Sequence, residues 1–194
     1  MRSSAATFFP PTVRSLVATA CLAAAGCASG PPAGIEPVGN FDAERYLGTW
    51  YEIARLDHRF ERGLEAVSAS YARNDDGTIA VVNRGWNVEE GKWQVAEGEA
   101  RFADGPDTGW LEVSFFGPFY GTYAVFELLE NEGGEYERAY VAGDDRDYLW
   151  FLSRTPEVEP AALDAFRERA AALGFDVGEL IVVDQGAAAL PPPE

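Results

Sequence analysis

The chain is poor in the side chains on which metal and thiol chemistry depend. Its 194 residues include two Cys, one His and one Met. A zinc site, an iron–sulfur cluster or a disulfide framework needs more Cys and His than this, so we expect no metal and no cofactor. The sequence also has neither a Gly-Lys-Ser/Thr phosphate-binding loop nor a Gly-x-Ser-x-Gly nucleophile elbow.

Basic residues are scarce as well. Lys and Arg number 15 against 32 Asp and Glu, and the formal net charge is −17. Long-range electrostatic repulsion therefore disfavours nucleic acid and anionic membrane surfaces as partners. What the chain does have is 47% hydrophobic and 13% aromatic residues. These proportions predict one globular domain and favour strands or a stacking cavity over a helical bundle.

The N-terminal apolar stretch is too short to cross a bilayer. It runs from Ser15 to Gly26, after Arg2 and Arg14, and ends in small residues directly before Cys27. About a dozen residues cannot span a hydrocarbon core of roughly 30 Å as a helix. The pattern resembles the processing box of bacterial lipoproteins, in which the Cys is acylated and becomes the new N-terminus. We therefore predict a signal peptide over 1–26 and lipidation at Cys27; an ordinary secretory signal is the alternative.

The segment after Cys27 is typical of a linker. Residues 28–40 contain three Pro and three Gly with one charge, which predicts a flexible tether over 27–40. Ala28 and Ser29 follow the Cys, with no Asp there. By resemblance to sorting in Gram-negative lipoproteins, this implies a lipid anchor in the outer membrane with the domain facing the periplasm. Cleavage would also remove Cys21, which leaves no thiol for catalysis.

The pattern of turns in the body of the chain predicts a meander of strands. Clusters of turn-forming residues recur between 57 and 147, at intervals of about 12 to 16 residues. Each interval holds one strand and a tight turn, with no room for a crossover helix. Seven turns separate eight strands, and closure of these strands would remove two bare sheet edges. The prediction is an all-β fold, an eight-stranded antiparallel up-and-down barrel.

One helix is expected after the last barrel strand. Leu163, Phe166, Ala170 and Leu173 recur at helical spacing, and Gly174 follows as a stop. A single apolar stripe of this kind predicts a C-terminal helix packed on the outside of the barrel. Residues 179–183 are expected to form a short final strand, and 186–194 a disordered tail.

Several motifs resemble one family. The first is Gly48-Thr49-Trp50-Tyr51-Glu52, which opens the first predicted strand. Further motifs lie at 53–55, 58–64, 113–121, 145–150, 153–156 and 174–176. Together they resemble the bacterial lipocalin lipoproteins and the related apolipoprotein D group, over a barrel domain at 41–185. The resemblance implies an eight-stranded barrel that binds a small hydrophobic ligand without a cofactor; for the bacterial branch it implies fatty acids or lysophospholipids.

Two residues are predicted to close one end of the barrel. The last strand runs antiparallel beside the first, which brings Arg154 close to Trp50. A guanidinium over an indole face contributes about 0.5–2 kcal/mol, so we interpret this pair as structural. The matching Trp and Arg of the resembled family have this role.

The ligand site is predicted inside the barrel and at its open end, the mouth. Strand alternation puts Val113, Phe115, Tyr71 and Trp150 on the inner face. Near the mouth we expect Phe60, Trp86, Tyr120 and Arg84. A fatty acid or lysophospholipid would enter tail first and leave its head group near Tyr120 and Arg84. The alternative is that these side chains fill a solid core, and the inward parity of 122–129 and 135–142 stays open.

Three functions are compatible with these patterns. The leading hypothesis is a non-catalytic lipoprotein that stores or transports small hydrophobic ligands. A lipocalin-fold enzyme acting on a lipid and an envelope adaptor that binds no ligand are the alternatives. A homodimer is compatible with the sequence, which does not itself decide the oligomeric state.

Overall fold

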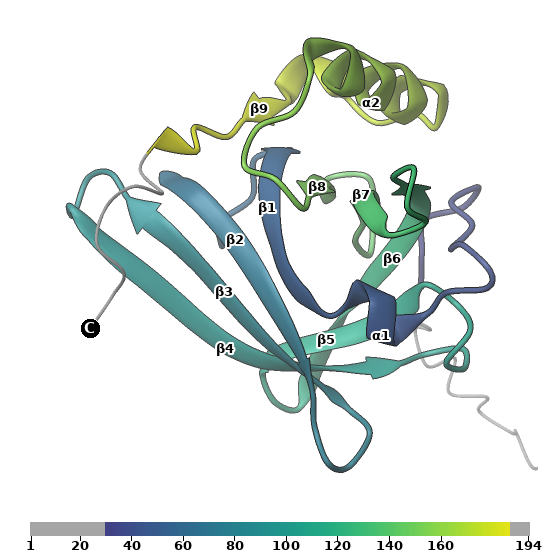
Figure 1. Ribbon diagram of the computed structural model, residues 1–194. Coiled ribbons are helices and arrows are strands. Elements are labelled where there is room, and N and C mark those ends of the chain that lie inside the picture. Colours follow the sequence, from purple (N-terminus) through teal and green to yellow (C-terminus); the bar gives the residue numbers. More distant parts are fainter. Residues whose placement is uncertain (1–29, 187–194) are drawn as a thin grey trace, which may run out of the picture.

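The computed structural model describes residues 30–186, and its centre is one closed antiparallel sheet (Figure 1). Each strand pairs with the next along the chain, and the first pairs with both the second and the eighth. The strands are β1 (Gly48–Arg55), β2 (Leu64–Arg73), β3 (Ile79–Asn87), β4 (Lys92–Phe102), β5 (Trp110–Phe116), β6 (Phe119–Glu130), β7 (Tyr136–Ala142) and β8 (Leu149–Ser153). This confirms the predicted eight-stranded up-and-down barrel.

A helix covers part of the outside, as predicted. α2 (Pro160–Ala172) buries Phe166, whose ring centroid lies 5.0 Å from Phe151 and 4.8 Å from Tyr140. Gly174, with a φ of +83°, follows its end. The final strand β9 (Ile181–Val182) pairs with β1. It is shorter than predicted because Val177–Glu179 form a 3-10 turn, η1, capped by Asp176.

The segment before the barrel packs against the barrel and is not a free tether over its whole length. Ile35 is buried, the Val38 N–H donates to the Val125 carbonyl at 2.8 Å, and Gly39 forms a β-bridge with Thr108. The predicted tether is therefore wrong for residues 35–40, because the apolar side chains between its Pro and Gly pack on the barrel. Cys27, the signal peptide and 187–194 lie outside the described residues.

A short helix, α1 (Ala43–Tyr46), crosses one end of the barrel before β1. The sequence analysis does not predict it; its N-cap is Asp42, whose carboxylate accepts the N–H groups of Glu44 and Arg45. We call this end the closed end, and the opposite end, with the 56–63 loop, the mouth. None of the helices within 30–186 is long and apolar enough to cross a membrane.

The apolar side chains form two cores on the two faces of the sheet. One core lies inside the barrel and includes Trp50, Tyr71, Leu111 and Leu152. The other lies between the sheet and α2. The parity left open by the sequence is now defined: Tyr123, Val125, Leu128, Tyr136, Ala139 and Val141 belong to the inner core, and Phe126, Tyr140 and Ala142 to the outer one.

Candidate functional site

The inner face of the barrel is not completely covered by its own side chains. Val113, Phe115, Tyr123 and Trp150 pack against the inner core, yet each retains an intermediate exposed fraction. Gly98 allows close packing between β4 and β5, because a Cβ there would lie 2.6 Å from the Ser114 carbonyl oxygen and 2.7 Å from the Phe115 ring. Part of the apolar inner face is thus accessible to solvent.

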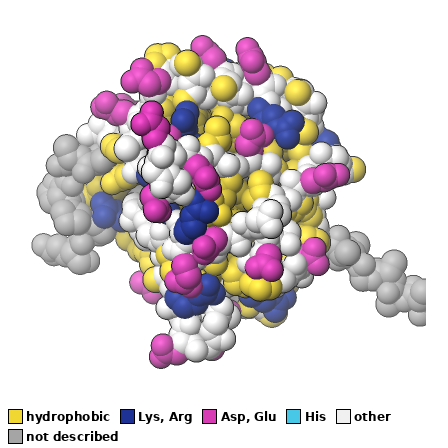
Figure 2. Space-filling model, turned by 45° about the vertical axis from the view of Figure 1, so that its right-hand side comes forward, with side chains coloured by type: hydrophobic (Ala, Val, Ile, Leu, Met, Phe, Trp, Pro, Cys, Tyr) yellow, Lys and Arg dark blue, Asp and Glu magenta, His cyan; other side chains and the backbone are white. Residues whose placement is uncertain are grey.

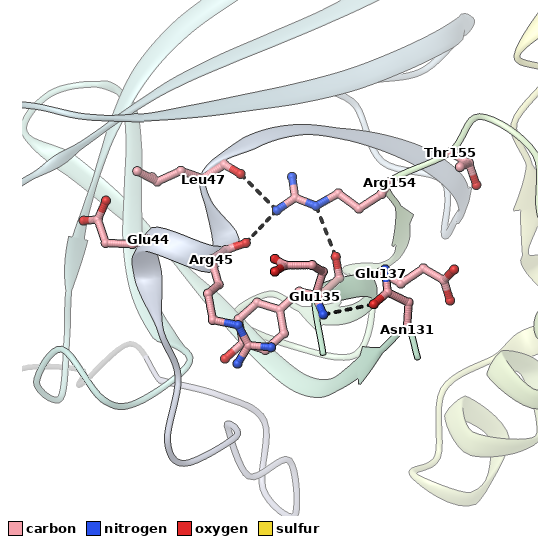
Figure 3. Close-up of a pocket in the computed structure, with 9 residues that line it drawn as sticks. Glu44, Arg45, Leu47, Asn131, Glu135, Glu137, Arg154 and Thr155 are labelled. Atoms are coloured by element: carbon pink, nitrogen blue, oxygen red, sulfur yellow. Dashed lines mark hydrogen bonds between the residues drawn. The ribbon is translucent and has the colours of Figure 1, made fainter. Parts of the chain in front are cut away.

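The predicted pair closes the end opposite the mouth. The Arg154 guanidinium lies 3.9 Å from the centre of the Trp50 ring, and Trp50 is fully buried. Arg154 also donates to the carbonyls of Thr49 (2.9 Å), Arg45 (2.8 Å), Leu47 (2.9 Å) and Tyr136 (3.3 Å). Figure 3 shows the bonds to Arg45 and Leu47. Burial lowers the pKa of Arg154, but the side chain stays a cation.

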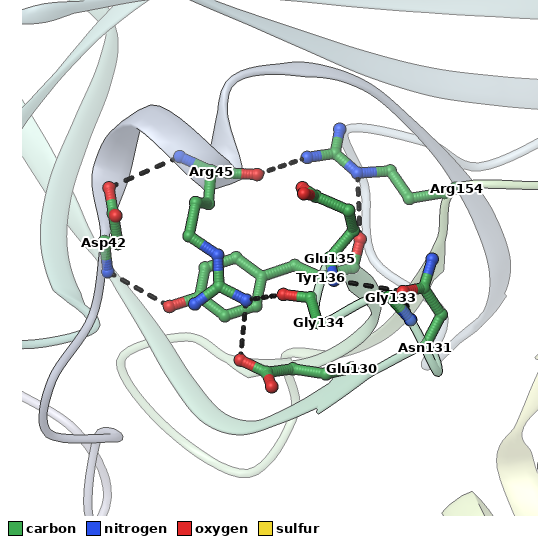
Figure 4. Close-up of polar contacts among 9 residues, drawn as sticks. All are labelled: Asp42, Arg45, Glu130, Asn131, Gly133, Gly134, Glu135, Tyr136 and Arg154. Carbon is green, nitrogen blue, oxygen red and sulfur yellow. Dashed lines mark hydrogen bonds and ion pairs between the residues drawn. The ribbon is translucent and has the colours of Figure 1, made fainter.

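A second set of contacts fixes α1 to the β6–β7 turn (Figure 4). The Arg45 guanidinium lies 3.9 Å from the centre of the Tyr136 ring and donates to Glu130 at 2.6 Å and to the Gly134 carbonyl. The Tyr136 hydroxyl accepts the N–H of Asp42 at 3.1 Å. A hollow of ≈ 520 Å³ lies here among charged side chains. These contacts hold the closed end in place.

The mouth contains a buried polar cluster. We call Glu52, Arg55, His58, Glu61 and Trp150 the mouth cluster. Arg55 donates to Glu52 at 2.7 Å and to the Glu61 carbonyl at 2.8 Å. Glu61 Oε2 lies 2.9 Å from His58 Nε2 and accepts the Trp150 indole N–H at 3.0 Å. The cluster thus joins the 56–63 loop to β1 and β8.

The two carboxyls of the mouth cluster differ in ionisation. Burial raises the pKa of Glu52 well above its usual range, and the Glu61 charge adds to this. Burial also opposes ionisation of Glu61, but His58 and the Trp150 N–H outweigh it and hold its pKa below the usual range. At a given pH, Glu52 is therefore protonated to a greater extent than Glu61.

The sequence of the barrel domain matches one known protein family. The model of the Lipocalin-like domain family matches residues 41–185. The chain belongs to the lipocalin family. Outer membrane lipoprotein Blc of Vibrio cholerae is 52% identical over 160 residues, 82% of this lipocalin and 91% of the relative. Blc of Escherichia coli K12 is 52% identical over 169 residues, 87% and 93% of the two chains.

Solved structures show the same fold at low identity. Insecticyanin from the tobacco hornworm Manduca sexta has a TM-score of 0.63 and 20% identity, covering 82% of this lipocalin and 89% of that chain. A cockroach allergen, Per a 4, has a TM-score of 0.60 and 18% identity, covering 79% and 94% of the two chains. These likenesses concern the barrel alone.

Four of the predicted ligand residues lie together in the barrel. Tyr71, Val113, Phe115 and Trp150 all belong to the inner core of this lipocalin or pack against it. Phe60 lies on the 56–63 loop and is 56% exposed. Its ring lies 4.7 Å from the Arg59 guanidinium and 6.1 Å from the His58 ring. Phe60 thus lies beside the mouth cluster, where the sequence analysis expects it.

Arg84 and Trp86 are not brought to the interior. Ala69 on β2 and Asn83 on β3 are paired and face inward, so the next residue, Arg84, faces outward. The Arg84 guanidinium lies 4.3 Å from the centre of the Trp93 ring. Trp86 is paired with Trp93, with ring centroids 5.7 Å apart. The predicted contact of Arg84 with a ligand head group at the mouth is therefore not supported by its outward placement.

Tyr120 also lies on the outer face. Its ring is 4.0 Å from the Arg101 guanidinium, and its hydroxyl is 3.5 Å from Glu99 Oε1. Gly121 pairs with inward-facing Val113, so Tyr120 alternates to the opposite side. The predicted head-group contact through Tyr120 is therefore not supported by its placement.

The sequence analysis did not predict the contacts that join the mouth cluster. The available signal was alternation, because Glu52 is two residues after inward-facing Trp50 and so shares its face. A carboxyl on the inner face of a strand is an unusual position. Carboxylates on the face in Figure 2 are spread over the surface. Within residues 30–186, no three His, Cys, Asp or Glu side chains are placed to hold a metal ion.

Proposed function

We propose that this lipocalin is a lipid-anchored outer-membrane protein, facing the periplasm, that binds long-chain fatty acids or lysophospholipids without chemical change. The observation that carries this proposal is the partly open apolar inner face, closed at one end by Trp50 and Arg154. A blind apolar space accepts a ligand tail first. The polar end of the ligand then stays at the mouth, beside Phe60 and Trp150.

Burial of the acyl chain supplies the binding free energy. Each methylene removed from water contributes about 0.8 kcal/mol, which gives on the order of 10 kcal/mol for a long chain. Association costs remove several kcal/mol of this. We therefore expect a Kd of about 1 μM or somewhat below. The net charge of −17 gives an anionic head group no long-range attraction, so its contacts are local.

Val113→Trp tests the location of the ligand. Val113 packs on the inner core and pairs with Ala100. An indole there fills the interior, so we expect the affinity for a fluorescent fatty acid to fall at least about tenfold. Val95→Trp is the matched control, because Val95 is 47% exposed and pairs with outward-facing Arg84. Both variants are first checked for the β-sheet circular dichroism spectrum.

Parent-like affinity in a folded Val113→Trp variant would contradict a ligand in the barrel. Mass spectrometry of the ligand recovered from the parent tests the absence of catalysis. A recovered lipid that differs from the lipid supplied would instead favour a lipocalin-fold enzyme.

The membrane anchor is tested at the N-terminus. The support is the run of small residues before Cys27 and the similarity to the outer membrane lipoproteins Blc. Several acyl chains are needed for stable attachment. We expect Cys27→Ser to lose its outer-membrane fractionation, while Cys21→Ser, the control, retains it. Outer-membrane localisation of the Cys27→Ser protein would refute the anchor.

A further inference from the structure

Three tyrosine hydroxyls meet inside the barrel, and we call them the tyrosine triad. Tyr46 comes from α1, Tyr71 from β2 and Tyr123 from β6. The Tyr71 hydroxyl donates to the Tyr123 hydroxyl at 2.9 Å, and the hydroxyls of Tyr46 and Tyr123 are 2.7 Å apart. The Tyr46 ring stacks on Trp50 with centroids 4.8 Å apart. The triad therefore lies at the closed end of the apolar interior.

The triad has more donors than it uses. Three hydroxyls carry three hydrogens, but the described residues form two bonds among them, arranged as an open chain through Tyr123. Tyr71 donates one hydrogen, and either Tyr46 or Tyr123 donates the second. The third hydrogen, on Tyr46 or Tyr123, has no acceptor among residues 30–186. The hydroxyls of the triad are part-buried, so the hydrogen without a protein acceptor is available to donate to an additional oxygen in the interior.

The electrostatics select a neutral oxygen over an anion. Burial raises the pKa of Tyr46, Tyr71 and Tyr123, so all three are uncharged donors at neutral pH. The charge of Arg154 lowers the pKa of Tyr46 and Tyr71. Its guanidinium, however, already contacts the Trp50 ring and four backbone carbonyls. A carboxylate at the triad would thus be desolvated without a free cation. A hydroxyl or ketone oxygen has no such cost of charge burial.

We propose that the tyrosine triad is a subsite for a neutral oxygen on the distal part of an acyl chain, so that this lipocalin favours hydroxy- or oxo-lipids over unmodified ones. This inference rests on the proposed function. Tyr71 is seven residues from Leu64 at the mouth, about 23 Å along β2. Because barrel strands are tilted, the depth below the mouth is shorter than this length, and we expect the oxygen on the distal half of a long chain.

The test compares ligands that differ only in that oxygen. Kd values are measured for palmitate and 16-hydroxypalmitate, and for stearate and 12-hydroxystearate, with the parent and with the triple variant Tyr46→Phe/Tyr71→Phe/Tyr123→Phe. The triple variant is needed because each single Phe variant still leaves a hydroxyl hydrogen without a protein acceptor. The readout is the ratio of the two Kd values in each pair, which cancels effects on the chain itself. We expect the preference for the hydroxylated lipid to fall about tenfold in the triple variant, the effect of one hydrogen bond. Tyr120→Phe, on the outer face, should leave the ratio unchanged.

The parent keeps the test decisive if the triple variant does not fold, because equal Kd values of the parent for the hydroxylated and the unmodified lipids would overturn the subsite. Ratios in the folded triple variant within twofold of the parent would overturn it as well. Failure of the parent to bind any of the four lipids would instead refute the proposed function, and the subsite with it. Binding of palmitate with no effect of the triad would refute the subsite alone.

Discussion

Arg154→Met should destabilise the barrel more than the loss of a surface cation would. Methionine retains an apolar stem over Trp50 but removes bonds to four backbone carbonyls. A hydrogen bond from a charged donor contributes about 1.5–3 kcal/mol, and water can replace about half of these bonds because Arg154 is only partly buried. With about 1 kcal/mol for the cation–π contact, we expect a loss of about 4–7 kcal/mol.

The assay is urea unfolding followed by far-UV circular dichroism. Arg154→Lys is the control for charge, because an ammonium cannot span four carbonyls and should restore only part of the loss. A cycle with Trp50→Leu should give a coupling energy of about 1 kcal/mol. A loss below about 1 kcal/mol in Arg154→Met, or strict additivity in the cycle, would refute a structural role for the pair.

Three further changes test the rest of the structure. Glu52→Gln should gain stability relative to the parent as pH rises above about 4.3, because folded Glu52 keeps a proton that the unfolded chain releases. The difference in unfolding free energy grows by about 1.4 kcal/mol per pH unit until Glu52 ionises in the folded state. Thermal unfolding at pH 5 and at pH 8 measures this difference. Trp150→Phe removes the N–H donor to Glu61 and should cost about 1–2 kcal/mol in urea unfolding; no change would show that this bond is unimportant. Phe166→Ala should cost about 3–5 kcal/mol, and an unchanged Tm would mean that α2 does not contribute to stability.

Local patterns were sufficient for the barrel and for most of its inner face. Tight turns leave no room for crossovers, so their spacing alone specifies consecutive antiparallel strands. Alternation then assigns Tyr71, Val113 and Trp150 to the interior, where the structure has them. The same rule, counted from inward-facing Val81, puts Arg84 outside. The sequence analysis interpreted Arg84 by its charge rather than by its register and so did not predict its outward placement.

Contacts between distant parts of the chain could not be predicted in this way. β2 contains a bulge at Ala66, a non-glycine residue with a φ of 49°. The Ala66 N–H donates to the Asp184 carbonyl at 2.7 Å, and Gln185 donates to the Glu52 and Val67 carbonyls. These bonds stabilise a backbone shape that no local motif specifies. The mouth cluster is similar, because it requires the 56–63 loop to meet β8.

Closure of the barrel also has a consequence for the order of folding. Tyr51 on β1 pairs with Ser153 on β8, about a hundred residues later in the chain. Loop-closure entropy opposes such distant pairing, so a fold of this contact order forms slowly compared with a helical bundle. During synthesis β1 emerges first and lacks one neighbour until β8 is complete. The seam between β1 and β8 is thus expected to form in the last stage of folding, and its exposed β1 edge is where the incomplete chain is most prone to aggregation.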